Sequence, residues 1–230
     1  MPNRPFKFRA DSEVNQLGIK VASVVVNGMK NERENSAFNF FRQKLLEDLK
    51  TNYSSNIIEE DPIIQGFRIL HNKIGRSNKK YISSIESLIG ILLRNGKFPS
   101  INLIVDIYNC ISLETRLSLG AHDLEKVHGN ITLRMTNGNE NFLQLGKSEA
   151  KKVNSGEYCY LDDSNEILCR MECHQSEKTK IELGTKNCIF IVQGNENTSK
   201  EYILSSTYKL LELLKKYCGG QETDFFVYAS

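Results

Sequence analysis

The spacing of apolar residues along this 230-residue chain changes near residue 125. Before that point, Phe38, Phe41 and Leu45 recur at the three- and four-residue intervals that place side chains on one face of an α-helix. The same periodicity returns near the end of the chain. Helices are therefore expected over residues 36–50, 61–74, 83–94 and 199–217.

Beyond residue 125 the apolar segments are short and are separated by Asn-Gly, Ser-Gly and Asp-Asp-Ser-Asn sequences, which favour tight turns. One earlier segment, rich in β-branched valines and followed by Asn27-Gly28, has the character of a buried strand. Strands are therefore expected over residues 19–26, 131–135, 141–145, 157–161, 166–171 and 187–192.

A helix-rich first half followed by a strand-rich second half predicts an α+β fold. Because the chain has no internal repeat, linker or low-complexity tract, we expect one domain over residues 1–230. It would consist of a strand and helix portion at 1–83 and a core at 84–218. The side chains expected inside that core are Val105, Ile107, Leu113, Leu133 and Ile189.

The charge pattern gives little information about partners. The formal net charge is +2, and basic residues occur in small groups such as Lys215-Lys216 instead of one long stripe. A brief contact with nucleic acid requires only a few neutralised phosphates, so this pattern neither indicates nor excludes one. No apolar run approaches the roughly 20 residues that cross a bilayer, so we expect a cytoplasmic protein with no membrane partner.

The chain has six cysteines, and three of them invite a zinc hypothesis. Cys169, Cys173 and His174 lie close together in the sequence, and Cys188 follows. The usual pair of closely spaced Cys/His knuckles is missing, and Cys169 and Cys173 fall in an expected strand. Buried, reduced cysteines without a ligand are the other interpretation, and no metal or cofactor is expected.

Several motifs follow one another between Ser84 and about Val192. The longest, FPSINLIVDIYNCISLE, runs from Phe98 to Glu114, and LGAHDLEK begins at Leu119. A Gly-Glu pair ending at Glu157 and a Thr-Lys-Asn sequence beginning at Thr185 come later. Together they resemble the B3/B4 domain of the phenylalanyl-tRNA synthetase β subunit, especially its freestanding relatives. The resemblance implies a three-layer α+β fold with a β-sandwich of unusual topology and flanking helices.

In the full-length synthetase this domain hydrolyses tRNA that carries the wrong amino acid. The family pocket is lined by a Thr-Asn pair, a His, a Glu and a late Thr. The resemblance places the pair at Tyr108 and Asn109, the His position at Gly120 and the late Thr at Thr185. His122 follows Gly120 by two residues, and on an extended segment both would face the same side.

The family Glu has no clear counterpart in this sequence, and His174-Gln175-Ser176 occupies the same general region. An aminoacyl ester is already activated, so a site can act by placing a water molecule and by hydrogen-bonding the developing oxyanion. The catalytic candidates for these tasks are Asn109, His122 and His174. The substrate-binding candidates are Asp106, Tyr108, Gly120, Gln175, Ser176 and Thr185.

Structural roles stand beside these functional ones. Asn109 could satisfy backbone groups in a tight turn, Tyr108 could belong to the core, and Asp106 could brace the chain. His71 and His128 are expected at the surface. If the functional interpretation holds, Tyr108, Asn109, His122, His174 and Thr185 should converge on one concave pocket.

The leading hypothesis is a trans-editing deacylase that removes a non-cognate or non-protein amino acid from tRNA. Its partner would be the aminoacylated 3′ end of tRNA, and no DNA partner is expected. The alternative is a tRNA- or RNA-binding module that has lost the chemistry, which the missing family His favours. An amino-acid-binding protein and a zinc hydrolase are further alternatives. The amino acid, the tRNA and the oligomeric state stay open.

Overall fold

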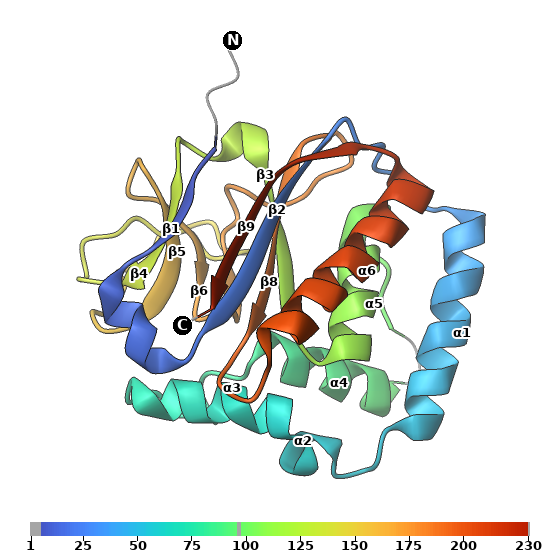
Figure 1. The fold of residues 1–230 in the computed structure, drawn as a ribbon, viewed down its shortest axis with the longest axis horizontal. Coiled ribbons are helices and arrows are strands. Elements are labelled where there is room, and N and C mark those ends of the chain that lie inside the picture. Colours follow the sequence, from blue (N-terminus) through green and yellow to red (C-terminus); the bar gives the residue numbers. More distant parts are fainter. Residues whose placement is uncertain (1–5, 96–97, 230) are drawn as a thin grey trace.

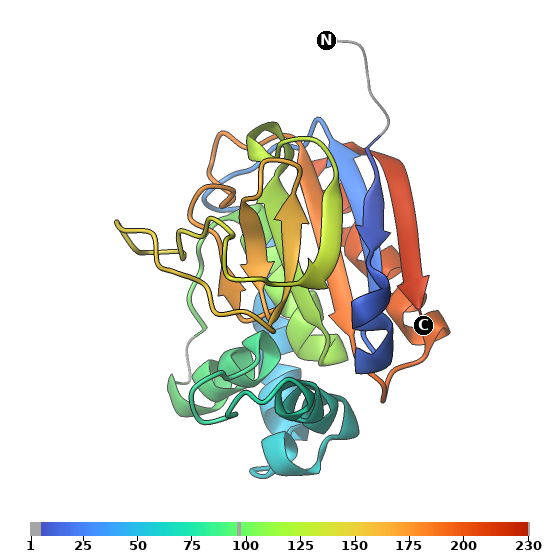
Figure 2. The same cartoon turned by 90° about the vertical axis from the view of Figure 1, so that its left-hand side faces the viewer.

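The computed structural model describes residues 6–95 and 98–229 and contains two β-sheets with helices around them (Figure 1). The first sheet has the strand order β1 (Phe8–Ala10), β4 (Ile131–Met135), β5 (Tyr158–Asp162), β6 (Ile167–Arg170) and β7 (His174–Gln175). The second has the order β3 (Ser118–Asp123), β8 (Cys188–Gly194), β2 (Lys20–Asn27) and β9 (Gln221–Ala229). Figure 2 shows the five-stranded sheet in front of the four-stranded one.

Three long helices form a third layer on the outer face of the four-stranded sheet (Figure 1). They are α1 (Ser36–Asn52), α5 (Leu103–Thr115) and α6 (Lys200–Cys218). The helices α2 (Ile57–Glu60), α3 (Pro62–Lys73) and α4 (Ser84–Asn95) lie along one end of the sheets, and two 3-10 segments complete the described elements, η1 (Ser12–Leu17) and η2 (Leu124–Lys126). The expected α+β class, with three layers, is confirmed.

Strand β2 explains why the layers stay together. It pairs antiparallel with both β8 and β9, so residues near the start of the chain join strands near its other end. Its side chains alternate between two cores: Val24 packs toward α5 and α6, whereas Val21 and Val25 pack between the sheets. Both faces are therefore buried, which accounts for the unbroken apolar sequence of this strand.

All five side chains predicted for the core are buried, with Val105 the most exposed of them at 6%. The helices predicted from periodicity and four of the later strands are also present, with ends shifted by a few residues. The predicted strand at 141–145 is wrong, because that segment makes only isolated bridges, from Asn141 to Glu166 and from Gln144 to Ser176. Within the described ranges, no helix is both long enough and apolar enough to cross a membrane.

A buried charge cluster ties the segment after α3 to the five-stranded sheet. Glu157 is fully buried, and its Oε1 accepts a hydrogen bond from Nε of Arg76 at 2.7 Å. Its Oε2 lies 2.9 Å from Nε of Arg170 on β6, as an ion pair without hydrogen-bond alignment. One carboxylate thus compensates two guanidinium groups that are themselves largely shielded from water.

Candidate functional site

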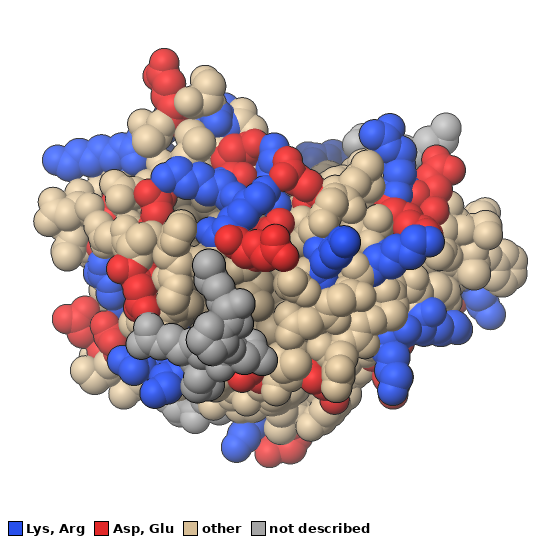
Figure 3. Space-filling model, turned by 90° about the horizontal axis from the view of Figure 1, so that it is seen from above, with Lys and Arg blue, Asp and Glu red and all other residues tan. Residues whose placement is uncertain are grey.

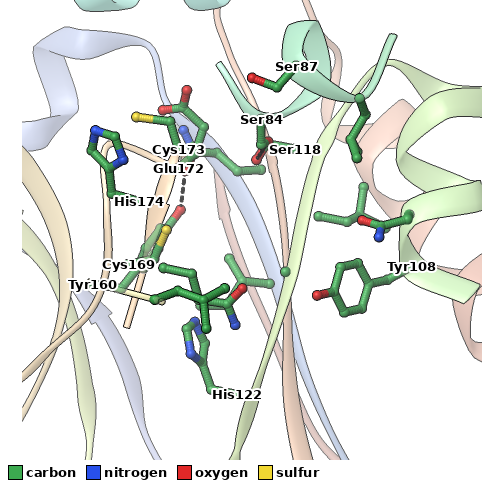
Figure 4. A pocket seen from close by; sticks show the side chains of 18 of the residues that line it. Ser84, Ser87, Tyr108, Ser118, His122, Tyr160, Cys169, Glu172, Cys173 and His174 are labelled. Carbon is green, nitrogen blue, oxygen red and sulfur yellow. Dashed lines mark hydrogen bonds between the residues drawn. The ribbon is translucent and has the colours of Figure 1, made fainter. Parts of the chain in front are cut away.

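A cavity of about 350 Å³ lies where the edge strands of the two sheets face each other (Figure 4). Strand β3 and its neighbour β8 form one wall, and β6, β7 and the turn between them form another. The first turn of α4 and the middle of α5 border the remaining sides. Of the sequence-predicted site residues, six line it: Tyr108, Asn109, Gly120, His122, His174 and Gln175.

Strand β3 places its residues by simple alternation. Ser118, Gly120 and His122 face the inside of the sandwich, opposite Gln193, Ile191 and Ile189 of β8. The expectation that residues 120 and 122 share a face is therefore confirmed. A Cβ atom added at Gly120 would meet no atom within 4 Å, so the missing side chain leaves this part of the cavity open.

Helix α5 supplies Tyr108 and Asn109. Asn102 begins the helix by accepting a hydrogen bond from the Val105 amide at 3.1 Å, and this cap sets which residues face the cavity. Tyr108 is 7% exposed, and burial raises its pKa well above the usual range. In the part of the chain that the structure describes, neither its hydroxyl nor the Asn109 carboxamide forms a hydrogen bond, and both line the cavity.

His122 is held from the opposite direction. Its Nδ1 lies 2.8 Å from Oγ1 of Thr179, and its side chain is almost completely buried. Burial lowers the pKa of His122 to about 3, so the ring is neutral at physiological pH. Since Nε2 has no partner among the described residues, it can serve as a hydrogen-bonding atom toward the cavity.

This burial predicts an acid-dependent loss of stability. Below pH 6.5, the ordinary histidine value, an unfolded His122 takes up a proton and the folded one does not, so lowering the pH favours unfolding. From pH 6.5 to 5 the His122 contribution to the free energy of unfolding should fall by about 2 kcal/mol.

The measurement is urea unfolding of the wild type and His122→Gln at several pH values. The difference in their free energies should shrink by that amount on acidification. Both proteins keep His174, whose pKa burial also lowers, and His71, whose pKa is raised, so these contributions cancel in the difference. Parallel pH curves for the two proteins would show that His122 does not titrate as inferred.

His174 lies at the far wall on β7, half-buried, with its ring edge against Tyr81. Its Nδ1 is 3.4 Å from Nε2 of Gln144. Burial, together with the charge of Arg170, lowers the pKa of His174. Its neighbour Gln175 donates from Nε2 to the Ala121 carbonyl at 2.7 Å and so joins the edges of the two sheets.

Three candidates lie outside the cavity. The expectation that Thr185 joins Asn109 there is wrong, because its hydroxyl donates to Asp123 at 2.8 Å and accepts from the Glu182 amide at 3.0 Å. Ser176 instead borders a shallow hollow near Lys178. Asp106 accepts from the Ile101 amide at 2.9 Å and from Ser100, so it braces the chain before α5.

The wall also contains a carboxylate that sequence reasoning missed. Glu172 has φ of 45° and follows Met171 at 52°, two successive left-handed residues that are not glycine. Such backbone costs about 1–3 kcal/mol per residue and persists only where the surroundings impose it. The Glu172 carboxylate accepts from the Tyr158 hydroxyl and lies 3.0 Å from Nε2 of His71.

His71 was expected at the surface, and that expectation is wrong, since it is 1% exposed. Its position could have been found from the sequence: it follows Ile64 by seven residues and Phe67 by four, on the apolar face of α3. Burial alone would lower its pKa, but the Glu172 charge and hydrogen bonds from Glu172 and the Tyr81 and Met171 backbones raise it overall.

The cluster His71, Glu172 and Cys173 has ligand atoms within 4.8 Å of one another, close enough to consider a metal. Both Glu172 oxygens are already engaged, and Sγ of Cys173 contacts the Arg170 carbonyl at 3.8 Å. Burial also raises the pKa of Cys173, which disfavours the thiolate that a metal would need. Cys188 packs in the helix-side core, away from Cys169 and Cys173, so the cysteine set proposed from the sequence does not assemble.

The surface charge around β3 is mixed. On the face shown in Figure 3, Lys and Arg side chains lie beside Asp and Glu side chains. Lys126 pairs with Glu182 at 2.6 Å, and Lys180 pairs with Glu177. Any contact with a polyanion on this face would therefore depend on a few local cations, because no broad basic field covers it.

Comparison with known proteins gives consistent results. A family model described as the B3/4 domain matches residues 69–218. The phenylalanine–tRNA ligase β subunit of Photorhabdus laumondii is 43% identical over 58 residues, which cover 25% of this chain and 7% of that protein. The same subunit from Mycoplasma genitalium is 27% identical over 111 residues, covering 48% of this chain and 14% of its own length.

Among solved structures, an N-terminal fragment of the phenylalanyl-tRNA synthetase β subunit from Pyrococcus horikoshii has a similar fold. Its TM-score is 0.53 at 12% identity, over 99% of this chain and 55% of that one. The chain thus spans about half of the solved fragment and a small part of the curated subunits that it matches.

Proposed function

The chain belongs to the B3/4 domain family, and on that premise we propose that it is a trans-editing deacylase, which hydrolyses the ester between a wrong amino acid and tRNA. The observation that carries the proposal is the cavity, where the Asn109 carboxamide and the Tyr108 hydroxyl have no protein partner in the described chain and His122 is neutral. The aminoacylated 3′ end of tRNA would be its ligand, encountered in the cytoplasm.

The proposed reaction needs no covalent intermediate. Water attacks the ester carbonyl carbon, the bond from that carbon to the ribose oxygen breaks, and the products are the free amino acid and a tRNA with a free terminal hydroxyl. Asn109 would donate to the carbonyl oxygen as negative charge develops on it. Nε2 of His122, or the ring of His174, would accept a hydrogen bond from the attacking water and orient it.

Orientation and electrostatics suffice for such a substrate. An aminoacyl ester is reactive, and fixing the water and the carbonyl in one cavity lowers the barrier by several kcal/mol, as an order of magnitude. Tyr108 and the apolar side chains Leu88, Leu119 and Ile191 would hold the amino acid. Gln175, with its amide committed to Ala121, would shape the wall, and Gly120 would leave room for the substrate.

One observation favours a second function, a tRNA-binding module without catalysis. The resemblance places the family His at Gly120, so that side chain is missing from the cavity. The partner would be the same, but the ester would survive the encounter.

The deciding experiment incubates the protein with tRNAs mischarged with a panel of amino acids and measures amino-acid release over the spontaneous rate. We expect accelerated release from at least one mischarged tRNA, with the rate unchanged by EDTA, because the proposed steps use no metal. Binding of tRNA without release from any panel member would establish the second function instead. A rate abolished by EDTA and restored by a divalent metal would contradict the mechanism.

A further inference from the structure

A buried carboxamide lies in the inner wall of the cavity. Gln193, on β8, is 1% exposed and lines the cavity, and its Oε1 accepts a hydrogen bond from the Tyr160 hydroxyl at 2.5 Å. Tyr160 reaches it from β5 of the other sheet. Nε2 of Gln193 has no hydrogen-bonding partner in the described structure. One end of this amide is therefore fixed while the other is left unpaired.

Buried polar atoms without a partner are uncommon in folded proteins, and each calls for an explanation. Here a second one borders the same cavity. The Tyr108 hydroxyl comes from α5, on the opposite side of strand β3, and it points toward the middle of the cavity (Figure 4). Gly120 lies on the strand between these two walls and has no side chain to fill the space.

We propose that Gln193 and Tyr108 determine specificity, selecting an amino acid whose side chain carries a hydrogen-bonding oxygen. This inference rests on the proposed function, because it concerns the amino-acid part of the same ligand. Nε2 of Gln193 can only donate, so it requires an acceptor, which a hydroxyl or carbonyl oxygen supplies. The Tyr108 hydroxyl can donate or accept, so it can complete the contacts of either group.

A hydrocarbon side chain of the same shape would bind poorly. It would cover both polar atoms and leave them unpaired, whereas a matching oxygen satisfies them. Sites built to hydrogen-bond a substrate group reject the analogue that lacks it much more strongly than apolar pockets reject a changed shape. The apolar part of the wall, formed by Leu88, Leu119 and Ile191, would hold the carbon skeleton of either ligand without discriminating between them.

The test uses non-hydrolysable 3′-aminoacylamido analogues of the terminal adenosine, in pairs that differ by one oxygen: threonyl against valyl, and tyrosyl against phenylalanyl. In the wild type we expect the oxygen-bearing member of at least one pair to bind about tenfold more tightly or better. Gln193→Leu and Tyr108→Phe should each reduce that preference to about threefold or less. Tyr202→Phe is the matched control, since its hydroxyl bonds the Thr115 carbonyl outside the cavity.

Thermal melting of each variant identifies any that fails to fold, and Tyr108→Phe keeps the ring and so tests the idea even if Gln193→Leu does not. Equal affinities within both pairs, a preference retained in the folded variants, or binding of no analogue would overturn the inference. Selective binding without ester hydrolysis would uphold it while refuting the deacylase. Hydrolysis at equal rates for both members of each pair, with equal analogue affinities, would do the reverse.

Discussion

Replacing Asn109 with Ala should lower the rate of amino-acid release from the preferred mischarged tRNA by about 100-fold or more, with little change in tRNA affinity. The reason is that this carboxamide lines the cavity without a protein partner in the described chain, so it is free to donate to the ester oxygen. Removing one donor to a developing oxyanion typically costs a factor of about 100 to 1,000. Single-turnover release and tRNA binding, measured separately, give the two quantities.

Asn39→Ala is the matched control, because Asn39 is an exposed residue on α1 whose loss makes the same chemical change far from the cavity. It should leave both the release rate and the affinity as in the wild type. A variant at Asn109 that retains the full release rate would remove the proposed oxyanion contact. A parallel loss of rate and tRNA affinity would show instead that Asn109 binds the ground state.

Replacing Glu157 with Gln should lower the free energy of unfolding by about 3 kcal/mol. The carboxylate is fully buried and compensates both Arg76 and Arg170, so the neutral amide leaves two shielded guanidinium groups without a counter-charge. Removing one partner from a buried ion pair typically costs about 3–5 kcal/mol, and the partial exposure of both arginines favours the lower end. Chemical denaturation at neutral pH measures the change.

Glu212→Gln serves as the comparison, since Glu212 is an exposed residue on α6. Its change in stability should stay within about 0.5 kcal/mol, the usual range for surface substitutions. If the two variants unfold at the same denaturant concentration, the buried cluster contributes far less than its geometry implies. A large loss restricted to Glu157→Gln would identify it as a main link between the helical end and the five-stranded sheet.

Periodicity found the elements whose signal is local and missed those that depend on partners. The helices α1, α3, α4 and α6 were predicted because each has one apolar face and one polar face. Helix α5 was not predicted, since it is buried nearly all round and its apolar run lacks the alternation of a surface helix. Strand β9 was also missed, because its many polar residues suit a strand only beside β2.

The candidate site shows the same division. The motifs led to Tyr108, Asn109, Gly120, His122, His174 and Gln175, which the fold gathers at one cavity. They gave no indication of Gln193 or Glu172. Gln193 reaches the cavity only because β8 pairs with β3 in a register that sets it opposite Ser118, and Glu172 only because two residues adopt left-handed backbone. Neither feature leaves a mark in a single sequence.

The pairing of β2 with strands from the far end of the chain also governs how the protein is made. As the nascent chain leaves the ribosome, the apolar segment of β2 emerges early, and its partners β8 and β9 come last. Contacts between such distant segments raise the contact order and slow folding. Until then, β2 is an uncovered strand that can associate with other chains. The cavity walls on β3 and β8 are therefore assembled only after nearly the whole sequence has been synthesised.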